Sequence, residues 1–177
     1  MDANKRWIGV ALALVAFGLI AGGAQTHSWW SGSSDGGSVG IGMRDVYLCL
    51  GERCAAKPMG SLGPELDSAG WYRAGMASSA AALLACALLL ALGGALLFGK
   101  RNALLAKTAV MACAVAATAA IVYVVLFPGH PETRMGYSVL MYFGGTGLGV
   151  AAGLTAVAGG SGHRLGRRET IPSADMR

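Results

Sequence analysis

The chain has 177 residues, of which 54% are hydrophobic and only 13% are charged. Soluble domains carry about 25% charged residues, so this chain has too little polar surface to cover a water-soluble globule. The formal net charge of +5 does not indicate nucleic-acid binding, because the basic residues lie at the ends of apolar segments without interleaved aromatic residues. Length and composition therefore predict a single integral membrane domain, with the lipid bilayer as its first partner.

Four apolar segments are long enough to cross a membrane. Each approaches or exceeds the roughly 20 residues that a spanning helix needs, and none contains Asp, Glu, Lys, Arg or His. In lipid the backbone must satisfy its own hydrogen bonds, so each segment is predicted to be an α-helix. The predicted helices cover residues 7–24, 74–98, 108–127 and 135–158.

The distribution of basic residues predicts the orientation. Most of the 14 Lys and Arg residues lie before the first helix, between the second and third, and after the fourth. The positive-inside rule then places both termini and a tail of residues 159–177 in the cytoplasm, with outer loops at 25–73 and 128–134. The cell membrane is the expected location, since no retention signal is present. The first segment also fits a cleavable signal peptide, because Lys5 and Arg6 precede its apolar core.

Small residues recur within the predicted helices. Gly145, Gly149 and Gly153 follow one another at the four-residue spacing that lets two membrane helices approach closely. This glycine face favours packing inside a single four-helix bundle, and a homo-oligomer contact is the alternative. Cys86 and Cys113, in the second and third segments, are expected to behave as small buried hydrophobic residues.

The first outer loop contains a cysteine pair. Cys49 and Cys54 are predicted to form a disulfide, because the loop faces an oxidising compartment and the spacing suits a tight hairpin. Residues 39–44 and 46–48 favour β-strand, whereas the Gly/Ser-rich residues 31–38 are typical of a flexible turn. Two thiols do not make a tetrahedral site, so neither a metal nor a cofactor is expected.

Aromatic residues lie beside the ends of the predicted helices. Trp29, Trp71 and Tyr72 occupy positions where anchors at the membrane–water interface belong. His27 and His130 are single imidazoles in loops, and we expect both to be solvated rather than ligands.

The order of these features resembles the claudin and peripheral myelin protein superfamily. In that family the first outer loop carries a Trp, then Gly-Leu-Trp, then two cysteines, and an Arg just before the second helix. The matching positions here are Trp30 (or Trp29), Gly42, the cysteine pair and Arg73. The resemblance implies an all-α membrane protein, a four-helix bundle capped by a small, disulfide-pinned, β-rich outer loop.

The chain also departs from the family pattern. Gly-Leu-Trp is replaced by Gly42-Met43-Arg44, the cysteines are closer together than is usual, and the second outer loop is shorter than a junction-forming claudin needs. These departures argue against paracellular sealing and limit the implication to the fold. Convergence on the same four-helix plan is an alternative origin of the likeness.

No catalytic motif is present: the sequence has no phosphate-binding glycine loop, zinc-spaced His/Cys set or nucleophile elbow. We expect a non-catalytic membrane protein whose outer loop makes protein or cell-surface contacts, as a homo-oligomer or within a larger complex. An accessory subunit of a transporter or respiratory complex is one alternative. A thiol–disulfide oxidoreductase is another, with Cys49 and Cys54 as the redox pair and Cys86 or Cys113 as a relay, although a Cys-x-x-Cys motif is absent.

Overall fold

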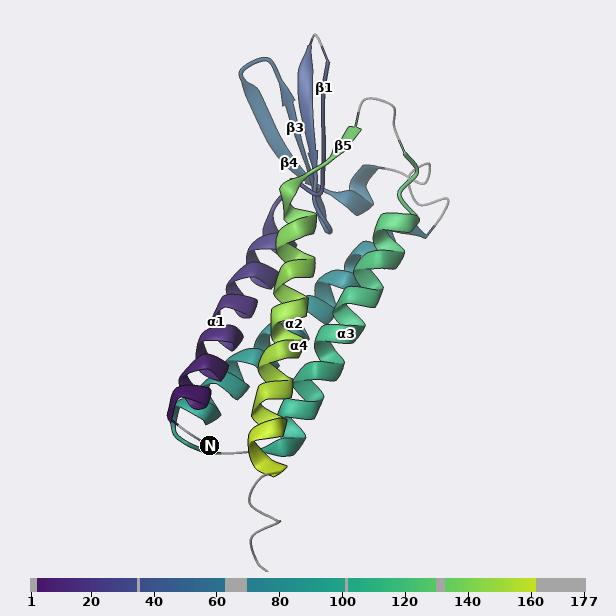
Figure 1. Ribbon diagram of the computed structural model, residues 1–177. Coiled ribbons are helices and arrows are strands. Elements are labelled where there is room, and N and C mark those ends of the chain that lie inside the picture. Colours follow the sequence, from purple (N-terminus) through teal and green to yellow (C-terminus); the bar gives the residue numbers. More distant parts are fainter. Residues whose placement is uncertain (1–2, 35, 63–69, 101, 130–132, 162–177) are drawn as a thin grey trace, which may run out of the picture.

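Four long helices form a bundle, and a small antiparallel sheet lies at one end of it (Figure 1). The computed structural model describes residues 3–34, 36–62, 70–100, 102–129 and 133–161. The helices are α1 (Ala3–Gln25), α2 (Trp71–Leu97), α3 (Ala103–Val125) and α4 (Tyr137–Ser161). By length and composition all four can cross a membrane, which confirms the prediction of four such helices.

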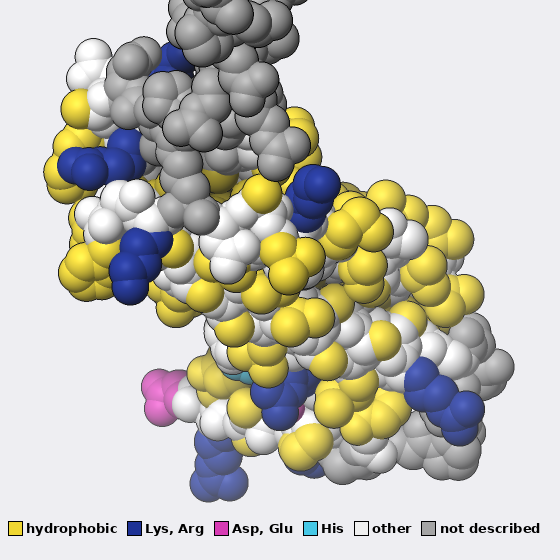
Figure 2. Space-filling model, turned by 90° about the horizontal axis from the view of Figure 1, so that it is seen from below, with side chains coloured by type: hydrophobic (Ala, Val, Ile, Leu, Met, Phe, Trp, Pro, Cys, Tyr) yellow, Lys and Arg dark blue, Asp and Glu magenta, His cyan; other side chains and the backbone are white. Residues whose placement is uncertain are grey.

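The surface of the bundle matches an apolar surrounding. Hydrophobic side chains cover much of its described surface, and Lys and Arg side chains stand apart from one another (Figure 2). Large side chains such as Leu83, Leu140 and Val125 point outward, with Leu140 77% exposed. An apolar belt of this kind would aggregate in water and is stable in lipid.

Local signals set the helix ends. The side chain of Asn102 accepts a hydrogen bond from the Leu105 N–H at 3.1 Å and so caps the start of α3. Gly99, with φ of 69°, ends the turn after α2 in the left-handed region that glycine adopts most readily. The α2–α3 connection is therefore short and lies at the end of the bundle opposite the sheet (Figure 1).

The glycine face of α4 packs inside the bundle. A Cβ added at Gly145 would lie 2.8 Å from the Ile20 nitrogen of α1, and one at Gly153 would overlap Val110 of α3. Gly149 likewise lies against Cys113. The three glycines therefore allow close helix contacts within one chain, and this face is not available for a contact between copies.

The sheet has five strands, all antiparallel to their neighbours, in the order β4-β3-β2-β1-β5. The strands are β1 (Trp30–Ser34), β2 (Gly37–Ile41), β3 (Asp45–Leu50), β4 (Arg53–Pro58) and β5 (Thr133–Met135). A single 3-10 turn, η1 (Met59–Leu62), follows β4. Four strands come from the segment between α1 and α2, and the fifth comes from the segment before α4.

The structure corrects one prediction for this region. Residues 31–38 were expected to form a flexible turn, but they form most of β1 and the start of β2. Glycine and serine have low strand propensity, and here the hydrogen-bonded neighbours on both sides of β1 override it. The short segment before α4 was not expected to contain a strand, yet β5 pairs with β1 through Trp30 and Met135.

Candidate functional site: the sheet and its base

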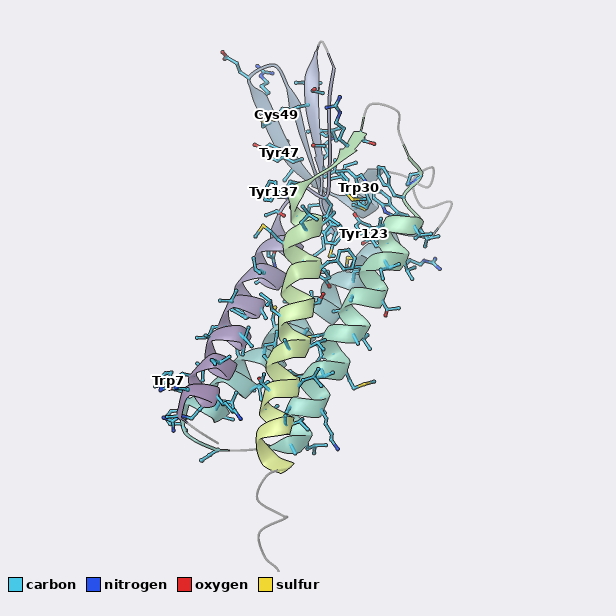
Figure 3. The ribbon with its side chains drawn as sticks, viewed as in Figure 1. Trp7, Trp30, Tyr47, Cys49, Tyr123 and Tyr137 are labelled. Carbon is cyan, nitrogen blue, oxygen red and sulfur yellow. A yellow bond between two sulfur atoms is a disulfide. The ribbon has the colours of Figure 1, made fainter. Side chains whose placement is uncertain are left out.

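A cluster of aromatic side chains joins the sheet to the bundle. This aromatic cluster consists of Trp29, Trp30, Trp71, Tyr123, Phe127 and Tyr142. The Trp30 ring stacks on Phe127 with centroids 4.1 Å apart, and Trp71 stacks on Tyr123 at 5.3 Å. Figure 3 shows Trp30 and Tyr123 close together beneath the sheet. Each such pair contributes roughly 0.5–1.5 kcal/mol beyond its buried area, so the cluster fixes the sheet firmly to the helices.

Hydrogen bonds complete this junction. The Tyr123 hydroxyl of α3 donates to the carbonyl oxygen of Gly42, which lies just after β2. The Trp29 indole N–H donates to the Gly23 carbonyl at 2.6 Å. At the start of α4, the Ser138 hydroxyl is hydrogen-bonded to the hydroxyls of Thr26 and Ser28. These bonds link the segment before β1 and the residue after β2 to α1, α3 and α4.

Two glycines let the backbones meet at the junction. A Cβ at Gly75 of α2 would overlap the Met43 carbonyl oxygen, and one at Gly42 would lie 2.9 Å from the Thr26 carbonyl oxygen. Met43 itself is fully buried. No larger residue fits either position without moving backbone, so both glycines are structural requirements of the docked sheet.

Two of the predicted interface anchors lie inside the protein instead. Trp29 is 0% exposed and Trp71 is 1% exposed, because both pack in the aromatic cluster and cannot reach lipid headgroups. Tyr72 is half-buried, and its role at the interface stays a prediction. Trp7 and Tyr137 are exposed instead, at 54% and 61%, near opposite ends of the bundle (Figure 3), and Phe98, just after α2, is also exposed. Their positions beside the helix ends are the sequence signal typical of anchors at the membrane–water interface.

The residues that carry the family resemblance fall at the junction or near it. Trp30 is buried in the aromatic cluster, and the Gly42 carbonyl is bound by Tyr123. Arg73 is exposed on the first turn of α2. Arg44, which stands where the family has its second Trp, is exposed, and its carbonyl accepts the Met59 N–H at 2.8 Å.

The predicted disulfide is confirmed. Cys49 and Cys54 are bonded and lie directly opposite one another in the β3–β4 hairpin. Cys86 and Cys113 are free and buried in the bundle. At 1.5 Å per residue, Cys86 lies about 22 Å along α2 from its first residue, so direct exchange with the hairpin disulfide would require a large movement.

The described part of this region offers few side chains that could bind a metal ion. The described residues include no group of three or more His, Cys, Asp or Glu side chains that could hold a metal ion. His27 is half-buried, and its ring lies 5.7 Å from that of Tyr47 on β3. His130 lies outside the described residues.

The strand register gives the sheet two different faces. Paired residues share a face, so Val39 lies with Leu48 and Ile41 with Val46, and this face is apolar across β2 and β3. The opposite face is polar; it carries Ser31, Ser33, Ser38, Asp45, Tyr47, the disulfide and Arg134. A cavity of about 570 Å³ lies against the apolar face, and its other wall includes Trp71 and Phe127.

No protein-family model and no curated protein matches the chain.

Proposed function

We propose that this is a non-catalytic, multi-pass membrane protein that uses its sheet as a rigid surface for protein contacts. The observation that carries the proposal is the junction, where buried aromatic rings and hydrogen bonds from three helices hold the sheet. A surface held in this way loses little conformational entropy when a partner binds, and preorganisation of this kind favours affinity.

The accessible parts of the sheet have the composition of a contact surface. All six residues of β4 are exposed, and β4 lies at one edge of the sheet, where a partner strand can add. Tyr47 is 40% exposed and Leu50 is 74% exposed on the neighbouring strand. Tyrosine and arginine are enriched at interfaces, and Arg53 follows Leu50 across the hairpin.

The claudin and peripheral myelin protein plan is part of the proposal. Its support is a bundle of four helices capped by a disulfide-pinned sheet, with Trp30 and Gly42 in the junction. The proposed orientation rests on the basic residues: Lys5 lies near the start of α1, Lys100 in the α2–α3 connection and Lys107 near the start of α3. The start of α1 and this connection lie at the end of the bundle opposite the sheet (Figure 1). We propose that this end faces the cytoplasm of a cell membrane and that the sheet lies outside.

A crosslinking experiment in cells tests the contact function. A photoreactive benzophenone amino acid replaces Tyr47, or Met111 of α3 as a control that faces away from the bundle. We expect discrete protein adducts from position 47, including adducts with a second copy if the chain is a homo-oligomer. The adducts should decrease when Ala56→Glu is added, because Ala56 is exposed and lies directly opposite Tyr47 on the same face, whereas Lys107→Glu should leave them unchanged. An absence of protein adducts at position 47 would contradict the proposal.

A further inference from the structure

The cavity beside the sheet has mostly apolar walls. One wall is formed by Val39, Ile41, Val46 and Leu48 on the apolar face of β2 and β3. None of its described lining residues is charged. Its volume of about 570 Å³ falls within the roughly 300–1,000 Å³ that is typical of small-ligand sites, which are also mostly apolar. The cavity is therefore suited to an aliphatic chain.

The position of the cavity brings it next to the membrane. Trp71 is the first residue of α2, and Phe127 follows the last turn of α3, and both line the cavity. The cavity therefore starts where the apolar helices end. In a bundle that spans a membrane, this level adjoins the neighbouring leaflet.

Trp71, which lines the cavity, also carries a buried hydrogen-bond donor. The Trp71 indole N–H is buried and has no hydrogen-bond partner among the described residues. Buried donors are almost always paired, so an unpaired one calls for an acceptor. Phospholipids carry ester carbonyl groups at the top of each acyl chain, and a carbonyl oxygen is the acceptor that an indole N–H binds.

Two basic residues of the edge strand β4 lie on the same face of the sheet as the cavity. Lys57 lies directly opposite Val46, and Arg53 lies directly opposite Leu50, so both share the face that lines the cavity. Both are exposed. The described strand positions on this face carry no acidic residue. A ligand with an apolar chain and an anionic headgroup matches this arrangement.

We propose that the cavity binds an acyl chain of an anionic phospholipid from the surrounding membrane. The chain lies between the apolar face and Trp71, and the phosphate lies near Arg53 and Lys57. This inference goes beyond the proposed contact function and does not depend on it, because the contact test reports from Tyr47 on the opposite face of the sheet.

The test uses purified full-length protein in nanodiscs. Phosphatidylglycerol or phosphatidylcholine carries a photoactivatable diazirine at the end of one acyl chain, and adducts are mapped by mass spectrometry. Adducts on the outward faces of the helices provide the internal reference. We expect adducts on β2 and β3 as well, with a 2- to 30-fold preference for phosphatidylglycerol, roughly what two exposed charge contacts supply.

Two variants and a control separate binding from misfolding. Val39→Phe fills the cavity and should remove the strand adducts, whereas Ala56→Phe adds an aromatic ring on the opposite face and should keep them. The double substitution Arg53→Gln and Lys57→Gln changes only exposed side chains and should abolish the preference for phosphatidylglycerol. An intact Cys49–Cys54 disulfide and unchanged helix adducts verify folding.

Three results would overturn the proposal. They are adducts on the helices alone in the wild-type protein, equal strand adducts from both lipids, and strand adducts that persist in folded Val39→Phe. If Val39→Phe does not fold, the double substitution Arg53→Gln and Lys57→Gln tests the proposal instead, because it leaves the apolar wall intact. A preference for phosphatidylglycerol that persists in this variant would then overturn the proposal. A failure here leaves protein adducts at position 47 unaffected, so the two proposals fail separately.

Discussion

Replacing Tyr123 by Phe removes a single oxygen from the centre of the junction. The hydroxyl donates to the Gly42 carbonyl, and both residues are buried. The ring, with its stacking on Trp71 and its edge contact with Trp29, remains. The Gly42 N–H still binds the Asp45 carbonyl at 2.9 Å, so the local turn is preserved. The substitution therefore isolates one hydrogen bond between α3 and the sheet.

The loss leaves a buried carbonyl without its partner, which costs about 1–3 kcal/mol. For a chain of this size, 1 kcal/mol corresponds to roughly 2–4 °C in the melting temperature. We expect Tyr123→Phe to melt several degrees below the wild type in detergent micelles and to exchange amide hydrogens faster in β2 and β3. Tyr137→Phe, at an exposed position, should change neither quantity. Equal melting temperatures for the two variants would refute the account of the junction.

The remaining predictions concern glycines. Gly75→Ala should lower the melting temperature, because its Cβ overlaps the Met43 carbonyl, and this cost outweighs the roughly 1 kcal/mol that alanine gains over glycine in a helix. Gly94 has open space around it, so Gly94→Ala should be neutral or stabilising in the same thermal assay. Gly153→Ala should lower the melting temperature without changing the oligomeric state measured by light scattering, whereas Gly147→Ala on the open side of α4 should leave both unchanged. A change of oligomeric state with Gly153→Ala alone would contradict packing within one bundle.

Much of the fold could be predicted from local features of the sequence. Long segments without charge predict spanning helices because no other backbone structure is stable in lipid. The disulfide followed from two cysteines at hairpin spacing in a loop between such helices. Both signals are contained in short stretches of chain, and both are confirmed.

The junction could not be predicted in the same way. An aromatic residue at a helix end looks the same in sequence whether it contacts headgroups, as Trp7 can, or packs in the protein, as Trp71 does. β5 has three residues and no periodicity, and it exists through its pairing with β1. The cavity is made by strand residues and by Phe127, far apart in the chain, so only the folded arrangement reveals it.

The most direct test of the central claim is thiol labelling of intact cells with a membrane-impermeant reagent, before and after reduction. The account predicts that Cys49 and Cys54 react only after reduction, because they are bonded in a sheet outside the membrane. Cys86 and Cys113, buried in the bundle, should stay unlabelled and serve as the internal control. Labelling of Cys49 and Cys54 without reduction would contradict the disulfide-closed sheet, and labelling only after permeabilisation would contradict the orientation.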